Sequence, residues 1–262
     1  MQTEPLPPMN GFDMRGKWVL VTGASSGLGA HFAQRMAQAG AHVVLAARRA
    51  DALAAQVQAI EAQGGRAHAL TLDVSDAAQV CAALAQMAEQ RGLPDVLINN
   101  AGVTVGRAAL AQSVDDFDHV MNTNVRGAWL VATELARLWV AAQRGGVVVN
   151  VASILGERVA GGVAPYAMSK AAVVQMTKAL ALEWARLGIR VNALLPGYVV
   201  TDLNRDFLAS PAGDKLRERI PSRRFCQLHD LDGPLLLLAS DAGAAMTGTT
   251  LAVDGGHLVS GL

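Results

Sequence analysis

The chain contains two tyrosines, and one of them, Tyr166, stands four residues before Lys170. If a helix begins near Pro165, residues four apart lie on one face and one turn apart, so the lysine charge would sit beside the phenol. An unperturbed phenol has a pKa of about 10, and a nearby ammonium favours the phenolate and lowers that pKa. The pair would then donate and accept protons near neutral pH. Alone, this spacing is common and mostly structural, and the sequence reveals no role for Ser169, which stands between the two.

Ser153 changes the interpretation of this pair. It follows a predicted strand over residues 147–151 and precedes Tyr166 by thirteen residues. Ligands of open α/β sheets bind at the carboxyl ends of the strands, so Ser153 could hold a substrate carbonyl or hydroxyl next to Tyr166. Together with a dinucleotide-binding turn upstream, these side chains predict a proton-transfer site rather than a surface pair.

That turn is the segment TGASSGLG, residues 22–29, between a predicted strand and a predicted helix. Its first glycine permits a tight turn, and the other two let a ligand and the sheet approach the backbone. Amide groups at the start of the helix then point at an anion, aided by the helix dipole. The spacing is GxxxGxG rather than GxGxxG, and a tight turn without a ligand remains the alternative. The residues that we expect at the cofactor here are Gly23, Ser25, Ser26, Gly27, Leu28 and Gly29.

The end of the second strand discriminates between two dinucleotides. An acidic residue there would bind the ribose 2′-hydroxyl of NAD, whereas an arginine would accommodate the 2′-phosphate of NADP. This strand ends in Arg48 and Arg49 without an acid, and Asp51 comes too late. We therefore expect NADP(H), with NAD(H) as the alternative if both arginines are ordinary solvated charges.

Two further strand ends carry polar residues that could line the cofactor cleft. Asp73 could accept a hydrogen bond from the adenine amino group, or it could cap the next helix, a role that Ser75 could fill alone. Asn99 and Asn100 precede a small, flexible step, which suits a cleft lining but also a simple turn. The residues assigned to the cofactor in these two segments are Asp73, Val74, Asn100, Ala101 and Gly102.

The elements that must position these residues alternate along the chain. Short apolar runs predict buried strands at residues 17–22, 41–47, 67–72, 96–99, 147–151, 190–195 and 251–253. Helical windows, such as residues 28–39 and 51–63, lie between nearly all of them. The alternation predicts an α/β single-domain Rossmann fold, a doubly wound parallel sheet of about seven strands with helices on both faces. We expect a flexible tail over residues 1–14, one catalytic domain over 15–262, and a substrate lid over 198–226.

The composition excludes several classes of function. Lys plus Arg and Asp plus Glu both number 22 in the 262 residues, which argues against a nucleic-acid or membrane-surface partner. The two cysteines imply no disulfide framework and suit a reducing cytosol, and the six scattered histidines predict no metal site. Without a long apolar run or a signal peptide, the sequence predicts a soluble cytoplasmic protein.

From about Arg15 onward, these motifs resemble the short-chain dehydrogenase/reductase family. The resemblance implies that Tyr166 is the general acid/base, that Lys170 activates it and binds the nicotinamide ribose, and that Ser153 orients the substrate. It also implies that Asn124 is the fourth catalytic residue, which holds a water in a proton relay, although Asn122 is an equally good amide from sequence alone. The matching segments are residues 22–29, 73–74, 99–102, 153, 166 with 170, 196–197 and 254–256.

The resemblance also implies the remaining pocket residues. Cofactor contacts near the nicotinamide would come from Pro196, Gly197, Val199 and Thr201. The substrate would contact Ser153, Leu155, Val163 and Tyr198. The mostly small or apolar surroundings predict a modest ketone or secondary alcohol, and Tyr198 could stack on it or fill the core. Arginines at 205, 217, 219, 223 and 224 in the lid leave open an anionic substrate tail, or a solvated helix face.

We therefore expect an NADP(H)-dependent oxidoreductase acting on a ketone or secondary alcohol. The alternatives are an NAD-dependent alcohol dehydrogenase, a 3-oxoacyl-thioester reductase, an epimerase or dehydratase, and a non-catalytic sensor. The resemblance implies a homotetramer or homodimer formed through the helix after Lys170 and the C-terminal strand. Trp129 and Trp139 could join that interface, whereas the stripe at Val174 and Thr177 is more typical of a core.

Overall fold

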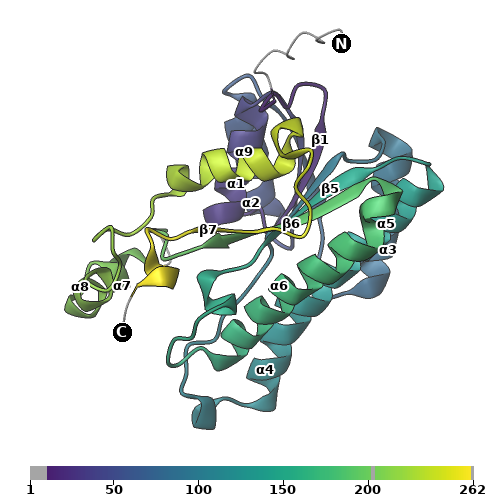
Figure 1. The fold of residues 1–262 in the computed structure, drawn as a ribbon. Coiled ribbons are helices and arrows are strands. Elements are labelled where there is room, and N and C mark those ends of the chain that lie inside the picture. The colour runs from purple at the N-terminus through teal and green to yellow at the C-terminus, as the bar shows by residue number, and fades with distance from the viewer. Residues whose placement is uncertain (1–10, 202–203, 261–262) are drawn as a thin grey trace, which may run out of the picture.

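The computed structural model describes residues 11–201 and 204–260. One seven-stranded sheet, with every pairing parallel, runs in the order β3-β2-β1-β4-β5-β6-β7 (Figure 1). The predicted fold class is therefore confirmed, and each expected strand lies within one residue of its predicted bounds. The strands are β1 (Trp18–Thr22), β2 (His42–Ala47), β3 (Arg66–Thr71), β4 (Val96–Asn99), β5 (Gly146–Val151), β6 (Ile189–Pro196) and β7 (Thr250–Val253).

Helices cover both faces of the sheet. On one face lie α1 (Gly27–Gln38), α2 (Ala50–Glu61) and α9 (Asp232–Ala239). On the other lie α3 (Ala77–Arg91), α4 (Val114–Met121), α5 (Ala128–Ala141) and α6 (Ala164–Trp184). The strand order reverses between β1 and β4, and the crevice beyond the carboxyl ends of these two strands is where such sheets bind ligands.

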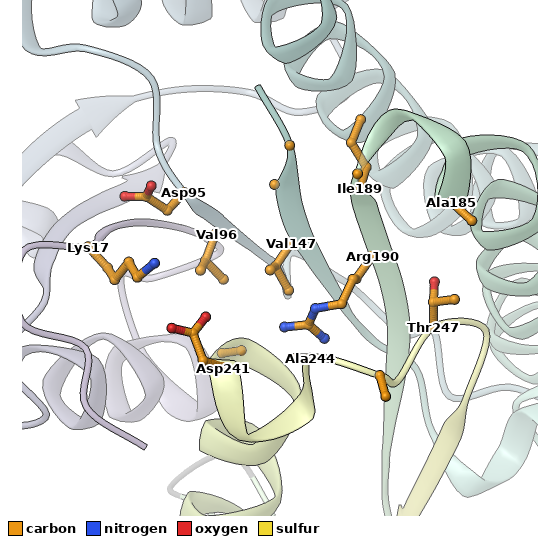
Figure 2. A pocket seen from close by; sticks show the side chains of 15 residues that line it. Lys17, Asp95, Val96, Val147, Ala185, Ile189, Arg190, Asp241, Ala244 and Thr247 are labelled. Carbon is orange, nitrogen blue, oxygen red and sulfur yellow. The ribbon is translucent and has the colours of Figure 1, made fainter. Parts of the chain in front are cut away.

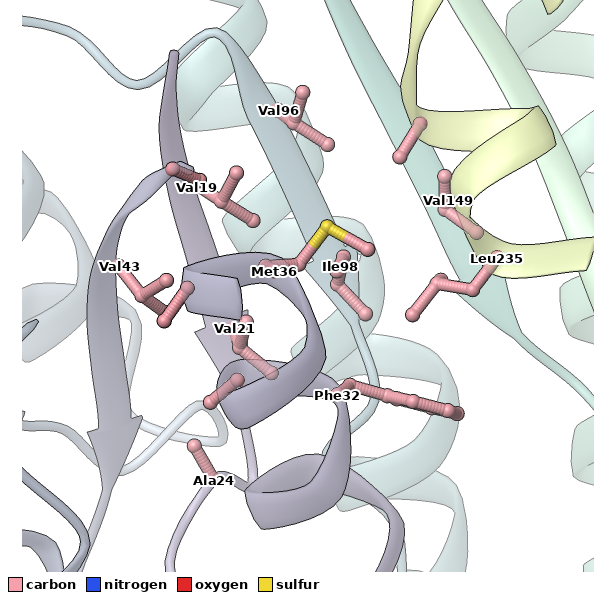
Figure 3. Close-up of a cluster of buried hydrophobic side chains, with 14 of the residues drawn as sticks. Val19, Val21, Ala24, Phe32, Met36, Val43, Val96, Ile98, Val149 and Leu235 are labelled. Carbon is pink, nitrogen blue, oxygen red and sulfur yellow. The ribbon is translucent and has the colours of Figure 1, made fainter. Parts of the chain in front are cut away.

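Two apolar cores, one on each face of the sheet, hold the layers together. Because side chains alternate along a strand, Val19 and Val21 face one core and Leu20 faces the other. Figure 3 shows the first core, in which Phe32 and Met36 of α1 pack against Val19, Val21, Ile98 and Leu235. All six side chains are fully buried.

Trp139 belongs to the second core, so its expected place in a subunit interface is wrong. Its side chain is fully buried, and its Nε1 donates to the Pro94 carbonyl at 2.7 Å. A Cβ at Gly146 would lie 2.5 Å from the indole, so the ring packs directly against the start of β5. Trp129, on another face of the same helix, is 46% exposed.

The folded region begins before residue 15, the expected start of the domain. Met14 is fully buried, and its amide donates to the Ala39 carbonyl at 3.1 Å. The Gly11 carbonyl accepts from the amide of Ala242 at 2.9 Å. The apolar Met14 side chain therefore anchors the end of the predicted tail, and residues 1–10 lie outside the described part of the chain.

The segment proposed as a lid forms two short helices, α7 (Arg205–Leu208) and α8 (Pro211–Arg217). A small apolar cluster of Leu208, Ile220 and Phe225 holds it together, and Tyr198 packs against this cluster. Its base is a bridge between Val199 and Cys226. None of the helices among the described residues combines the length and apolarity needed to cross a bilayer.

Candidate active site

Tyr166, Lys170 and Ser153 meet at the carboxyl end of β5. Helix α6 has proline in its first turn, as predicted, and it places the Lys170 Nζ 5.6 Å from the centre of the Tyr166 ring. The Lys170 Nζ donates to the Val151 carbonyl at 2.8 Å, and the Ser153 side chain hydrogen-bonds to the Tyr166 hydroxyl. The structure therefore brings the three predicted residues into one cluster.

The protonation of this cluster differs from the expectation. Burial raises the pKa of Tyr166, and the hydrogen bond from Ser153 opposes this without overcoming it. Burial also lowers the pKa of Lys170 to about 8. The expected lowering of the Tyr166 pKa by Lys170 is wrong in this structure, because the phenolate would lose its solvation while the ammonium is bonded to the Val151 carbonyl.

Asn124 connects this cluster to the loop after β4. Its Oδ1 accepts from the Val103 amide at 2.7 Å, and its Nδ2 donates to the Val103 carbonyl at 2.9 Å. The same Nδ2 donates to Ser169 Oγ at 3.0 Å, and the Ser169 hydroxyl donates to the Tyr166 carbonyl at 2.7 Å. Asn124 is buried and Asn122 is exposed, so the structure distinguishes the two amides that the sequence left equivalent.

Two features of this connection were missed by sequence reasoning. Ser169 is fully buried and joins Asn124 to the backbone of the helix that carries Tyr166. The sequence feature that could have indicated this role is the position of Ser169 three residues after Tyr166, one turn along the same helix. The second feature is a π-helical turn, Asn122–Gly127, between α4 and α5, a geometry that is frequent at functional sites.

The glycine turn forms the closely packed cradle that was predicted. Gly23 has a φ of +66°, and a Cβ there would lie 2.8 Å from the Ala101 Cα. A Cβ at Gly29 would lie 2.3 Å from the Gly23 carbonyl oxygen. The Asn100 Nδ2 donates to the Thr22 carbonyl at 3.0 Å, so the amide side chain ties the end of β4 to the turn.

The start of α1 leaves amide groups available to an anion. Ser26 is the N-cap residue, but its side chain makes no capping hydrogen bond to the helix. Instead the Ser25 and Ser26 hydroxyls each accept from Nη2 of Arg49 at 3.0 Å. A guanidinium thus lies directly against the turn, where its charge would meet a phosphate.

Asp73 does not cap helix α3, and Ser75 does not fill that role either. The cap is Asp76, whose side chain accepts from the Gln79 amide at 3.1 Å. Asp73 Oδ1 accepts from the amide and the hydroxyl of Ser75 at 2.9 and 2.7 Å. These hydrogen bonds, more than the charge of Arg48, lower the pKa of Asp73, which is therefore an ionised acceptor at the cleft.

The other predicted cofactor residues lie at or after the carboxyl ends of β3, β4 and β6. Val74 packs under Gly127, and a Cβ at Gly102 would lie 3.5 Å from Lys170 Nζ. Beyond Pro196, a Cβ at Gly197 would lie 2.8 Å from the Asp254 Cα, so β6 and the turn after β7 are in contact. Asn204 secures the next segment, accepting from the Thr201 amide at 2.8 Å and donating to the Val199 carbonyl at 2.9 Å.

The predicted substrate residues come from the segment between β5 and α6 and from the start of the lid segment. Leu155 and Val163 are half-buried, and Leu155 packs against the cluster that contains Ile154. The Tyr198 ring lies 6.4 Å from Phe225 and 5.7 Å from His257, centre to centre. Tyr198 also raises the pKa of Tyr166 electrostatically.

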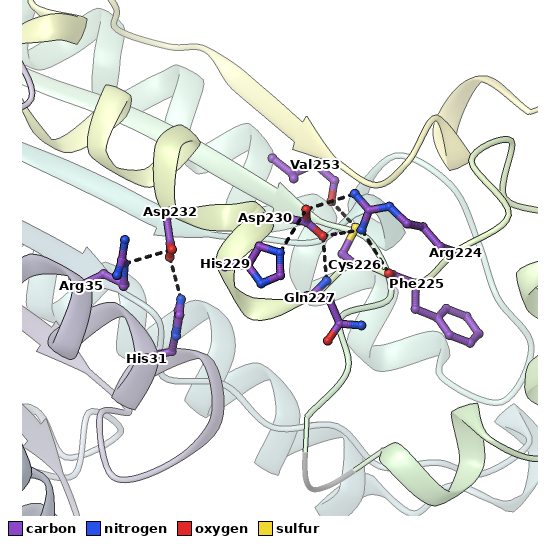
Figure 4. A network of polar contacts seen from close by, with 10 residues as sticks. All are labelled: His31, Arg35, Arg224, Phe225, Cys226, Gln227, His229, Asp230, Asp232 and Val253. Carbon is purple, nitrogen blue, oxygen red and sulfur yellow. Dashed lines mark hydrogen bonds and ion pairs between the residues drawn. The ribbon is translucent and has the colours of Figure 1, made fainter.

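Three lid arginines are committed to partners within or next to the lid. Arg224 pairs with Asp230 through two hydrogen bonds of 2.6 and 3.0 Å (Figure 4). Arg217 pairs with Asp214 at 2.8 Å, and Arg223 donates to the Glu218 carbonyl. These contacts favour a solvated surface for the three side chains over a role in binding an anion.

The cavity in Figure 2, of about 460 Å³, lies at the opposite, amino-terminal edge of the sheet. It is lined by residues that precede or begin strands, among them Lys17, Asp95 and Arg190. The Arg190 guanidinium donates to the carbonyls of Leu238, Ser240 and Met246, which gives it a structural role. None of the predicted site residues lines this cavity.

Comparisons with known proteins agree with this architecture. A family model described as "Enoyl-(Acyl carrier protein) reductase" matches residues 23–257. The gluconate 5-dehydrogenase of Gluconobacter oxydans is 38% identical over 251 residues, which are 95% of this chain and 97% of that protein. A short-chain type dehydrogenase/reductase from Mycobacterium marinum is 38% identical, with a TM-score of 0.89 over 95% of this chain and 98% of that chain. A gluconate 5-dehydrogenase from Burkholderia cenocepacia, solved in complex with NADP and tartrate, is 35% identical, with a TM-score of 0.92 over 96% of this chain and 99% of that chain.

Proposed function

This chain belongs to the short-chain dehydrogenase/reductase family, and we propose that it transfers a hydride between NADP(H) and a small ketone or secondary alcohol. The observation that carries the proposal is the cluster of Ser153, Tyr166 and Lys170 at the sheet edge that also holds the glycine cradle. The relatives named gluconate 5-dehydrogenase support a substrate with a secondary hydroxyl.

In this proposal Tyr166 moves the proton and its neighbours hold the reacting oxygen. The nicotinamide, when bound, supplies or accepts the hydride. In the reductive direction the Tyr166 hydroxyl donates its proton to the substrate oxygen as the carbonyl becomes an alcohol, and in oxidation Tyr166 takes a proton back. Ser153, hydrogen-bonded to the same hydroxyl, holds the substrate oxygen beside it.

Lys170 and Asn124 support this transfer in different ways. With a pKa of about 8, Lys170 is mostly protonated at neutral pH and can exchange protons there, and the Val151 carbonyl fixes its ammonium. The Asn124 amide is engaged by Val103 and Ser169. We therefore assign Asn124 the role of holding the loop after β4 against helix α6 beside Tyr166.

The residues present fit NADP(H). Gly23 and Gly29 leave no room for side chains, so a pyrophosphate could approach the backbone there. Arg49, held against Ser25 and Ser26, supplies the cation that a 2′-phosphate requires, and Arg48 adds a second exposed charge. The relative from Burkholderia cenocepacia that was solved with NADP supports the same choice.

The replacement Tyr166→Phe tests the chemistry. It removes the hydroxyl and keeps the ring, so kcat should fall by about a hundredfold or more while the Kd for NADPH stays unchanged. Steady-state turnover of a panel of ketones, with NADPH binding followed by fluorescence, measures both quantities. Turnover by Tyr166→Phe at the rate of the unmodified enzyme would overturn the assignment.

The replacement Arg49→Gln tests the cofactor. Loss of a charge-assisted hydrogen bond to a phosphate should raise the KM for NADPH about tenfold or more and leave the KM for NADH unchanged. Arg137→Gln, an exposed arginine that pairs with Glu134 on α5, is the matched control. An unmodified enzyme that prefers NADH would contradict the proposed cofactor.

A further inference from the structure

A second cluster of polar side chains joins the loop that follows Ser153 to the C-terminal turn. Arg158 Nη1 donates to the His257 carbonyl and, at 2.9 Å, to Ser260 Oγ. The His257 ring lies 5.7 Å from the ring of Tyr198, one of the predicted substrate residues. The Arg158 amide donates to the Ile154 carbonyl at 2.9 Å, so the cluster belongs to the same short turn as Ser153 and adjoins the predicted substrate residues.

His257 is buried and leaves a polar atom without a partner. Its side chain is 5% exposed, and among the described residues its Nδ1 has no hydrogen-bond partner. A buried donor or acceptor left unpaired is costly, and native proteins rarely retain one without a reason. A ligand that hydrogen-bonds to Nδ1 would remove this cost, and a histidine with its proton on Nδ1 would offer a donor.

The charges around His257 are predominantly positive. The positive charges of Arg158 and of Arg219, an exposed lid residue, act to lower the pKa of both Tyr198 and His257. Asp254 is the opposing charge, but its two oxygens already accept from the amides of Gly256 and Leu258 at 2.8 and 2.6 Å. Burial and the two guanidiniums lower the pKa of His257, so in this arrangement it is neutral at pH 7, and a bound anion would raise that pKa.

The lid contacts the turn that leads to His257. The Ser222 amide donates to the Gly255 carbonyl at 3.1 Å, and a Cβ at Gly255 would lie 2.2 Å from Ser222 Oγ. Arg158 uses only Nη1 for its hydrogen bonds within the described residues, so Nε and Nη2 remain for a ligand. Planar guanidinium groups bind carboxylates through such paired donors.

We propose that Arg158, His257 and Arg219 bind a carboxylate of the substrate, so that the enzyme acts on short keto acids or the corresponding hydroxy acids. The inference rests on the proposed hydride transfer at Tyr166 and adds the chemical class of the substrate. The sequence had suggested that lid arginines in general could bind an anionic substrate. The proposed site keeps only one of them, Arg219, and adds two residues from outside the lid.

Direct binding of a carboxylate that does not react tests the site independently of catalysis. Malonate titrated into the protein by isothermal calorimetry should bind the unmodified chain, and Arg158→Gln, Arg219→Gln and His257→Leu should each raise its Kd about tenfold or more. Arg217→Gln is the matched control, because this lid arginine is paired with Asp214. Arg158 also anchors the C-terminal turn, so Arg219→Gln and His257→Leu decide the outcome if Arg158→Gln does not fold.

Turnover separates this inference from the proposed function. Short γ- and δ-keto acids are assayed with NADPH, each beside its methyl ester, and the ratio of kcat/KM for acid over ester is compared among variants. The ratio should favour the acid about tenfold or more in the unmodified enzyme, fall in the three variants and persist in Arg217→Gln. If the three residues had a purely structural role, replacing them would lower the turnover of acid and ester alike and leave the ratio unchanged.

Each outcome decides one of the two proposals. Equal turnover of acids and esters together with malonate binding unaffected by the three variants would overturn the carboxylate site and leave the hydride transfer intact. Malonate binding that depends on these residues, without turnover of any ketone, would support the site and overturn the proposed function.

Discussion

At the scale of single residues, burial decides how the proton-transfer cluster titrates. Lys170 Nζ is enclosed and bonded to the Val151 carbonyl, while the Tyr166 hydroxyl is bonded to Ser153. Burial therefore lowers the pKa of the amine and raises the pKa of the phenol. The spacing of the two residues predicted their proximity, but it could not predict which of their atoms would lose contact with water.

The low pKa of Lys170 predicts a specific dependence of stability on pH. In the unfolded chain the amine titrates near 10.5, whereas in the folded chain its pKa is about 8. Between these values the unfolded state binds more protons, so stability rises with pH. The cost of burying the ammonium, roughly 3 kcal/mol, is fully present below pH 8 and is lost toward pH 10.5.

Lys170→Met removes this titration. Without cofactor, the free energy of unfolding of the unmodified protein minus that of Lys170→Met should increase by roughly 2 to 3 kcal/mol between pH 7 and pH 10. Urea denaturation at a series of pH values measures this difference. Lys178→Met, at an exposed position on the same helix, should show no such trend, and parallel profiles for all three proteins would refute the prediction.

At the scale of elements, the junction of β1 and α1 is held by contacts that leave no room for side chains. Gly29 lies on the first turn of α1 against the Gly23 carbonyl, and Asn100 ties that turn to β4. The cradle is therefore closely packed against the end of β1 and the segment after β4. This packing explains why glycine is required at both positions even though only Gly23 has a positive φ.

Gly29→Ala should damage folding and cofactor binding together. Its Cβ would lie 2.3 Å from a backbone oxygen that cannot move aside cheaply. We expect a loss of about 1–3 kcal/mol in the free energy of unfolding, as for other overpacked sites, and a weaker Kd for NADPH. Thermal denaturation and fluorescence titration check the two effects. Gly106→Ala, where a Cβ meets nothing within 4 Å, should change neither, and a similar loss there would argue against the steric explanation.

At the scale of the whole molecule, one apolar surface lies on the helical face formed by α4, α5 and α6. A hollow of about 410 Å³ there is lined by Met121, Val125, Trp129 and Met176, among other residues. Trp129 is 46% exposed, and Leu182 of α6, which does not line the hollow, is 83% exposed. Strand β7 is in addition an edge of the sheet. These features support the proposed homodimer or homotetramer, because apolar helical surfaces and free edges are typical sites of self-association.

Trp129→Glu combined with Leu182→Glu should break this association. Buried carboxylates would be costly at such an interface, so the species should shift toward the 27.3 kDa of a single chain. Sedimentation velocity of the unmodified and double-variant proteins measures the change. Phe12→Glu, at an exposed position near the N-terminus, is the control for added charge. An unmodified protein that sediments as a single chain would refute the proposed oligomer.

Local patterns in the sequence were sufficient to predict the fold and the main site residues. Strands buried on both faces appear as continuous apolar runs, and a glycine cradle and a tyrosine–lysine spacing follow from backbone geometry. Each of these signals depends on residues close together in the chain. For that reason the sequence alone predicted the parallel sheet, the placement of Ser153, Tyr166 and Lys170 together, and the dinucleotide turn.

Only the tertiary structure decided the features that join distant segments. It distinguished Asn124 from Asn122, placed Trp139 in the core, and brought Arg49 against Ser25 and Ser26. It also brought Arg158 to His257, residues 99 positions apart, and left the His257 Nδ1 buried without a partner among the described residues. Burial and pairing of this kind depend on which segments pack together, and a pattern of neighbouring residues carries no information about contacts across the fold.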